Sequence, residues 1–266
     1  MGNSYTTAVI SSVSKLLVFI ILLFLRLRLR FFALFVFTCL ARAAAAQAPA
    51  ISPGFWQQQL AYARVQAAYA QRWPALAAHL HAHHFDPNRL EVFFRLLKTS
   101  RTLEVWARNQ GDATFRLLRG YPLAATSGTL GPKRYAGDGQ VPEGFYHLDR
   151  FNPSSTFHLS LGLDYPSAAD ILATGLADPG GDIFIHGSNV TIGCLPITDA
   201  GIDEVYLLAV AARAAGQASI EVHIFPFPLT KEELARRADS PHAAFWRELA
   251  PGYAYFEQHR VPGVGY

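Results

Sequence analysis

The sequence has few cysteines and little charge, and both shortages narrow the classes of protein it can encode. Only Cys39 and Cys194 occur, so no framework of disulfide bonds stabilises the fold. Charged residues make up 16% of the chain, and five of its 23 basic residues lie before residue 49, where no acidic residue occurs. The rest carries 18 basic and 20 acidic residues. This balance excludes the basic face that a nucleic-acid groove requires.

The first 48 residues have the pattern of a secretory signal peptide. The basic segment "RLRLR" (26–30) precedes an apolar segment, "FFALFVFTCL" (31–40), and "ARAAAAQA" (41–48) offers small residues at cleavage-site spacing. We therefore predict cleavage near Ala46 or Ala48 and a periplasmic mature protein without a transmembrane anchor. A membrane span over 16–40 is disfavoured because three arginines would lie within it. Lipid attachment at Cys39 is a weaker alternative, since Thr38 stands where glycine or alanine is usual.

Residue periodicity divides the mature chain into three parts. Residues 49–87 predict a helical lead-in, with a helix over 53–84 that breaks or restarts at Pro74. Residues 88–230 are rich in short β-forming runs, including an alternating strand over 155–164, and contain one strong helix from about Asp199, its expected N-cap, to Gly216. Residues 231–266 form a C-terminal helical extension that Thr230 and Glu233 begin as a capping box. The predicted fold class is α+β, with a mostly antiparallel sheet and flanking helices. Apolar residues make up 51% of the chain, enough for a sizeable core.

One histidine and the cysteine that remains after cleavage lie close together in the chain. The segment "DIFIHGSNVTIGCLPITD" (182–199) predicts a strand ending at His186, a loop, and a return at Cys194. A thiol attacks an acyl carbon as thiolate, so it needs a base within hydrogen-bond reach. We predict that His186 is this base. The alternative is an inert cysteine of the core, which the glycine beside each of the two residues makes less attractive.

The glycines and hydroxyls of the same loop have predicted supporting roles. Gly193 would let a substrate reach the main-chain N–H groups of Gly193 and Cys194, which could stabilise an oxyanion. Gly187 would free the approach to the imidazole. Ser188 and Thr191 are expected to orient the loop or the substrate.

Other histidines offer competing sites. The cluster "HLHAHH" (79–84) suggests zinc, but it contains no Cys, Asp or Glu, and a helix would spread its rings around the circumference. We predict no metal and no cofactor. His147, His158 and His223 stay open as additional members of the site.

These motifs resemble a known family, the YkuD-type L,D-transpeptidase catalytic domain. Its pattern, a strand ending in His-Gly followed by Ser/Thr-x-Gly-Cys, is similar to His186-Gly187 and to the segment from Thr191 to Cys194. The short gap, together with segments 128–170 and 216–230, looks like the YafK-like branch of that family. The resemblance covers roughly 88–258. It adds Lys133, Tyr146, Asn152, Tyr165 and Asp170 as residues of a substrate groove, although each also has an ordinary structural explanation.

The resemblance implies an enzyme that acts on peptidoglycan stem peptides. Cys194 would form a thioester with the third residue of the stem, and His186 would act as general base and then as general acid. An amine acceptor gives crosslinking or protein attachment, whereas water gives hydrolysis. Most family members follow the cysteine with an apolar residue and then Arg or Asn, whereas this chain has Leu195-Pro196. The missing polar residue leaves a murein L,D-hydrolase as an alternative. A noncatalytic peptidoglycan-binding module is a second alternative. A papain-like hydrolase is disfavoured because there the cysteine precedes the histidine. The acceptor, the group that orients the imidazole and the oligomeric state stay open at this stage.

Overall fold

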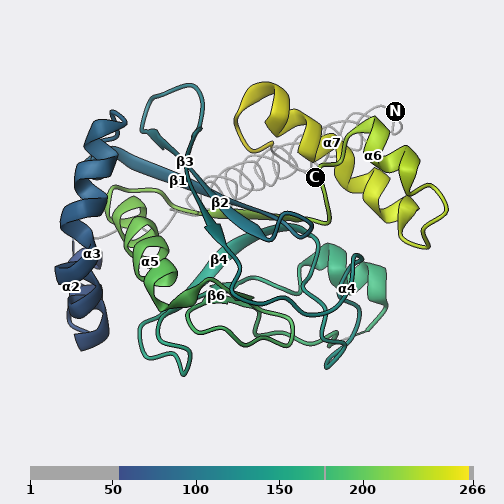
Figure 1. Cartoon of the computed structure of the whole chain (residues 1–266), viewed down its shortest axis with the longest axis horizontal. Coiled ribbons are helices and arrows are strands. Elements are labelled where there is room, and N and C mark those ends of the chain that lie inside the picture. The colour runs from purple at the N-terminus through teal and green to yellow at the C-terminus, as the bar shows by residue number, and fades with distance from the viewer. Residues whose placement is uncertain (1–53, 177, 264–266) are drawn as a thin grey trace, which may run out of the picture. The chain divides into compact units, whose positions relative to one another are not determined.

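A mixed sheet forms the centre of the computed structural model, which describes residues 54–176 and 178–263 (Figure 1). The eight strands of this sheet lie in the order β3-β2-β1-β8-β4-β5-β6-β7. All neighbouring strands are antiparallel except the pairs β1 with β8 and β6 with β7. The strands are β1 (Leu90–Leu97), β2 (Thr102–Asn109), β3 (Arg116–Pro122), β4 (Gly144–Asn152), β5 (Ser160–Leu163), β6 (Phe184–His186), β7 (Leu195–Pro196) and β8 (Glu221–Phe225). The predicted α+β class is confirmed, and the predicted signal peptide with its cleavage site lies outside the described residues.

Strand β1 is covered on both faces, which explains its almost unbroken apolar sequence. Because side chains alternate along a strand, Phe94 and Leu96 enter the main core, which also contains helix α5 (Thr198–Ala214). Phe93 and Leu97 point to the other face and pack in clusters with helix α7 (Ala243–His259). Helix α6 (Lys231–Arg236) has Thr230 as its N-cap, whose hydroxyl accepts the N–H of Glu233. The other half of the predicted capping box is not formed, because the Thr230 N–H donates to the carbonyl oxygen of Pro228.

The helical lead-in consists of two helices, α2 (Phe55–Leu60) and α3 (Ala63–Ala82), followed by a short 3₁₀ turn, η1 (Pro87–Arg89). Both helices pack against α5, beside which they run in Figure 1. The expected break at Pro74 is wrong, because Pro74 lies inside α3 and the interruption comes at Tyr62, whose backbone is extended. Pro74 is exposed, so water can satisfy the carbonyl that loses its helical donor.

Two further boundaries differ from the sequence prediction. The strand expected over 155–164 begins only at Ser160, because His158 has a φ of +71°, which an extended strand does not allow. Asp199 is not the N-cap of α5; it lies in the first turn, where its carboxylate accepts the N–H of Ser188 at 2.7 Å. Strand β4 and helix α4 (Ala168–Thr174) have no counterpart among the predicted elements. No helix in residues 54–176 and 178–263 combines the length and hydropathy that a membrane crossing requires.

Candidate active site

The pairing of β6 with β7 places His186 and Cys194 on the same face of the sheet. Ile185 is the register partner of Leu195, and both are fully buried on the core side. Side chains one position away therefore point to the opposite face. Phe184, His186 and Cys194 occupy these positions, and all three line one cavity.

This cavity, named the catalytic cavity after the predicted roles of His186 and Cys194, has a volume of about 280 Å³. Much of its wall comes from the connection between β4 and β5. Ser160 joins the lining because it is the register partner of His186 across β5 and β6. The complete lining is Asn152, Ser155, Thr156, Phe157, Ser160, Asp182, Phe184, His186 and Cys194. The structure thus brings together His186, Cys194 and one of the predicted groove residues, Asn152.

The imidazole of His186 has a fixed orientation. Its Nδ1 lies 2.6 Å from the carbonyl oxygen of Gly187, and since a carbonyl only accepts, Nδ1 carries the proton. The neutral ring therefore has its lone pair on Nε2, which is buried without a hydrogen-bond partner. The ring of Phe157 lies against the imidazole, with centroids 4.8 Å apart. Burial lowers the pKa of His186, so the ring is an uncharged base at neutral pH.

The thiol of Cys194 is half-buried and protonated at rest. Burial raises the pKa of Cys194 above its ordinary value, and the negative charge of Asp182 raises it further. A backbone hydrogen bond from Phe184 and the charge of Lys133 oppose these effects without reversing them. The thiol donates to the carbonyl oxygen of Asp182, with Sγ and oxygen 3.5 Å apart, and His186 Nε2 has no partner. The hydrogen bond between thiol and imidazole that the sequence predicts is therefore not formed in this structure. The resting pair is thus a neutral thiol and a neutral imidazole rather than an ion pair.

Thr191 organises the loop that carries the cysteine. Its hydroxyl donates to the carbonyl oxygen of Cys194 at 2.8 Å and accepts the N–H groups of Cys194 at 2.8 Å and Gly193 at 3.2 Å. The predicted role of Thr191 in orienting the loop agrees with these contacts. The expected oxyanion donors need a correction, because the N–H groups of Gly193 and Cys194 already bind Thr191 in this structure.

The glycines of the loop allow its backbone to pack closely against neighbouring segments of the protein. A Cβ atom at Gly187 would lie 2.4 Å from Asp199 Oδ1 and 2.8 Å from the Phe157 carbonyl oxygen. The expectation that Gly187 opens a path to the imidazole is therefore wrong, since protein atoms fill that space. Gly193 has a φ of +133°, and its Cβ would lie 3.1 Å from the carbonyl oxygen of Gln140. Ser188 also adopts a left-handed backbone, with a φ of +64°.

The remaining predicted groove residues do not line the catalytic cavity. Tyr146 is buried, and its hydroxyl lies 3.3 Å from Asp170, which closes the capping box of α4. The ring of Tyr165 packs beside Tyr146 with centroids 6.0 Å apart. Lys133 is buried and pairs with Asp138 at 2.7 Å. These four groove residues (Lys133, Tyr146, Tyr165 and Asp170) support the structure around α4 and the segment before β4, and Lys133 acts on Cys194 only through its charge.

The other histidines and the lead-in lie outside the catalytic cavity. His147 contacts Asp164, His158 binds Asp203 at 2.7 Å, and His223 is buried among aromatic rings of the sheet. Within the described part of the chain, no three side chains of His, Cys, Asp or Glu are grouped so that they could hold a metal ion.

Several residues of the lining carry no functional signal in the sequence. These are Phe157, which the alternation places on a strand, and Ser155, Thr156, Ser160, Asp182 and Phe184. Ser160 was detectable only through the pairing of β5 with β6, which local periodicity does not reveal.

Comparison with known proteins assigns the family. No family model matches the chain. Over 173 residues it is 38% identical to YafK of Escherichia coli (strain K12), which is provisionally named an L,D-transpeptidase, and the match covers 64% of this chain and 68% of YafK. The protein belongs to the L,D-transpeptidase family, in its YafK-like branch. YafK of Escherichia coli O157:H7 matches to the same extent.

Solved structures resemble this L,D-transpeptidase family member more distantly. The helical cell shape determining protein Pgp2 from Campylobacter jejuni has a TM-score of 0.40 and 22% identity, covering 51% of this chain and 47% of Pgp2. The K307A mutant of Pgp2 has a TM-score of 0.42 and 20% identity, covering 63% of this chain and 56% of the mutant. Bd1075 from Bdellovibrio bacteriovorus has a TM-score of 0.36 and 20% identity, covering 63% of this chain and 57% of Bd1075. The chain spans about half the length of each of these proteins.

Proposed function

We propose that this L,D-transpeptidase family member is a cysteine acyl-transfer enzyme acting on the stem peptides of peptidoglycan, after export to the periplasm. The observation that supports it most is that His186 and the half-buried thiol of Cys194 line the same cavity. The imidazole carries its proton on Nδ1, and its Nε2 has no hydrogen-bond partner. Family membership supplies the substrate class. A buried imidazole of lowered pKa matches a base that must be uncharged to accept a proton from a thiol.

In the first half-reaction, Cys194 attacks the carbonyl carbon of the L-centre of the third stem residue. The thiol proton passes to His186 Nε2 as the C–S bond forms. The bond to the terminal D-alanine then breaks, and His186 returns the proton to the leaving amine. The product is a thioester on Cys194 and a neutral imidazole.

In the second half-reaction, an acceptor attacks the thioester carbonyl. His186 takes a proton from the attacking amine or water, the C–S bond breaks, and the proton returns to the departing sulfur. The oxyanion that forms in both halves needs main-chain donors. Gly193 and Cys194 can supply their N–H groups only after the Thr191 hydroxyl releases them.

Hydrolysis is a second candidate outcome, and the residues after the cysteine favour it. Leu195 and Pro196 are buried in β7, so this position presents no polar side chain to a second stem peptide. Without such a group to hold an amine acceptor, water is the acceptor that remains.

Product analysis of the purified protein with disaccharide tetrapeptides tests both outcomes. Released D-alanine with crosslinked dimers supports transpeptidation, and D-alanine or cleaved dimers without new crosslinks support hydrolysis. Cys194→Ala must abolish either activity. No turnover by the parent protein, together with equal binding of parent and Cys194→Ala to sacculi, would instead identify a binding module.

A further inference from the structure

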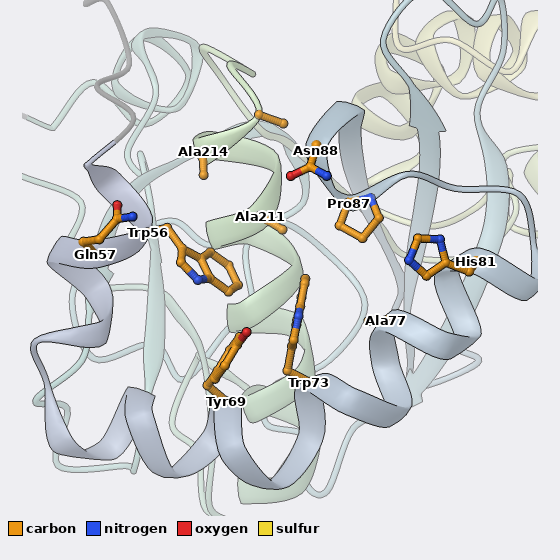
Figure 2. Close-up of a pocket in the computed structure, with 11 residues that line it drawn as sticks. Trp56, Gln57, Tyr69, Trp73, Ala77, His81, Pro87, Asn88, Ala211 and Ala214 are labelled. Atoms are coloured by element: carbon orange, nitrogen blue, oxygen red, sulfur yellow. The ribbon is translucent and has the colours of Figure 1, made fainter.

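A second cavity, separate from the first, lies between the lead-in helices and α5. It has a volume of about 500 Å³, within the range of small-molecule sites of roughly 300–1,000 Å³. It shares no lining residue with the catalytic cavity. Figure 2 shows Trp56, Tyr69 and Trp73 gathered in front of α5, with Asn88 and His81 beyond them. We name it the aromatic cavity.

Three aromatic rings form one wall of the aromatic cavity. Trp56 contacts Trp73 with centroids 4.9 Å apart, and Tyr69 lies nearly parallel to Trp73, with 5.8 Å between centroids and an angle of 21°. All three rings are only half-buried, so part of their surface faces the cavity. The space exists because α5 and its C-cap contribute only small side chains here, those of Ala211, Ala214 and Ala215.

The polar groups of the aromatic cavity are uncharged. Gln57 and Asn88 are exposed amides, and His81 adds an imidazole. Asn88 donates one N–H to Asp86 Oδ1 at 3.2 Å, which leaves its second N–H and its carbonyl oxygen for a ligand. None of the lining residues is Asp, Glu, Lys or Arg. A ligand that depends on ion pairs, such as a phosphate or a peptide terminus, finds no partner there.

Aromatic faces combined with neutral amides suit a sugar. The faces of the rings are electron-rich and attract the C–H groups on one side of a pyranose. Amide side chains can bind hydroxyl and acetamido groups at its edges. We infer that the aromatic cavity binds the N-acetylated glycan strand of peptidoglycan. The choice of this source of sugar rests on the proposed function, because the stem peptides of the proposed substrate are attached to that strand.

Titration of the purified protein with chitotriose, a neutral N-acetylglucosamine oligomer without stem peptide, tests the inference. Tryptophan fluorescence is a direct probe, since Trp56 and Trp73 are two of the four tryptophans and the other two, Trp106 and Trp246, are buried. We expect a saturable change of emission. The same change must occur in Cys194→Ala, because catalysis is not involved.

The variant Ala214→Leu fills the aromatic cavity without removing a ring. We expect it to bind chitotriose at least about tenfold more weakly, as when a central anchor of a binding site is lost. Ala75→Leu is the matched control: it lies on α3 two residues from both Trp73 and Ala77, hence about 200° around the helix from each, and must bind like the parent. Both variants should retain turnover of a free tetrapeptide that lacks sugar.

The results separate this inference from the proposed function. If the parent protein binds chitotriose, Ala214→Leu abolishes this binding and neither protein shows turnover, the result supports sugar binding in the aromatic cavity and refutes the proposed enzymatic function. Turnover without saturable sugar binding, or binding that Ala214→Leu leaves unchanged, overturns the inference. Binding of a proline-rich peptide in place of chitotriose would overturn it as well, because it would identify a peptide groove.

Discussion

Removing the hydroxyl of Thr191 should loosen the backbone that carries the nucleophile. Thr191→Val keeps the shape of the side chain and deletes three hydrogen bonds, one to the carbonyl and two from the N–H groups of Gly193 and Cys194. Each hydrogen bond contributes about 0.5–1.5 kcal/mol net. The bond to Gly193 is the longest at 3.2 Å and belongs at the lower end of that range.

Water can replace part of this network, because Thr191 and Cys194 are only half-buried. We therefore expect the free energy of unfolding to fall by about 2 kcal/mol, or roughly thirtyfold in the folded-to-unfolded ratio. Urea denaturation followed by fluorescence measures this loss. The rate of acylation of Cys194 by a carbapenem, followed by intact mass spectrometry, should fall about tenfold or more, since small displacements of a nucleophile are costly to its rate.

Two controls make the test of Thr191 specific. Thr191→Ser keeps the hydroxyl and should restore both stability and acylation. Ile192→Ala changes a neighbour that is 89% exposed, and it should alter neither. A Thr191→Val protein of unchanged stability that acylates faster than the parent would refute the reasoning, because freeing the two N–H groups for the oxyanion would then outweigh the loss of order in the loop.

Three further predictions follow from the same contacts. Because burial lowers the pKa of His186 and raises that of Cys194, kcat/KM should rise with pH through a limb that lies below the ordinary pKa of histidine, where the imidazole loses its proton. It should fall only at a pH above the ordinary pKa of cysteine, where the thiol loses its proton. Arg64→Ala should raise KM in stem-peptide kinetics more than it lowers kcat, since Arg64 holds the carbonyls of Ser155 and His158 that flank Phe157 in the cavity wall. Glu143→Ala should lower the free energy of unfolding by about 3–5 kcal/mol in urea denaturation, because it leaves the buried Lys98 ammonium unpaired and removes the acceptor of Trp246.

Each of these predictions has a contrary outcome. Ultraviolet titration that finds a Cys194 thiolate below pH 7 would contradict the neutral resting pair. Arg247→Ala, at an exposed position of α7, is the control for Arg64→Ala, and equal kinetics of the two variants would remove the positioning role of Arg64. A loss below about 1 kcal/mol in Glu143→Ala would mean that this pair behaves like a surface salt bridge.

The sequence contained enough to place the two central residues in one cavity, because the features that join them are local. His186 ends a short strand and Cys194 precedes the next, and a parallel pairing over two residues is sufficient to put both on one face. The family resemblance rests on this segment together with segments 128–170 and 216–230, and the comparison with YafK confirms the family.

The rest of the cavity depends on contacts between distant segments. Asn152, Phe157 and Ser160 reach it through the β4–β5 connection, which becomes a wall only when β5 pairs with β6. The alternation of apolar residues continues through 155–159 and therefore predicted a strand where His158 turns the chain. Arg64, more than 90 positions from His158, holds that turn in place.

The glycines illustrate a different reason for failure. An open approach for substrate and a close contact within the protein both require a residue without a side chain, so the sequence at Gly187 fits either. Only the positions of Asp199 and Phe157 show that the space is already filled. The sequence therefore identifies Gly187 as a position without a side chain, but it does not reveal which of these two roles the glycine has.

The mass of the protein during turnover tests the central claim most directly. Rapid mixing with a tetrapeptide stem, followed by acid quench and intact mass spectrometry, should reveal an adduct equal to the stem without its D-alanine, located by peptide mapping on Cys194. The adduct should disappear in Cys194→Ala and form far more slowly in His186→Ala. D-alanine released with no adduct on Cys194, or an adduct that forms equally fast without the imidazole, would contradict the account.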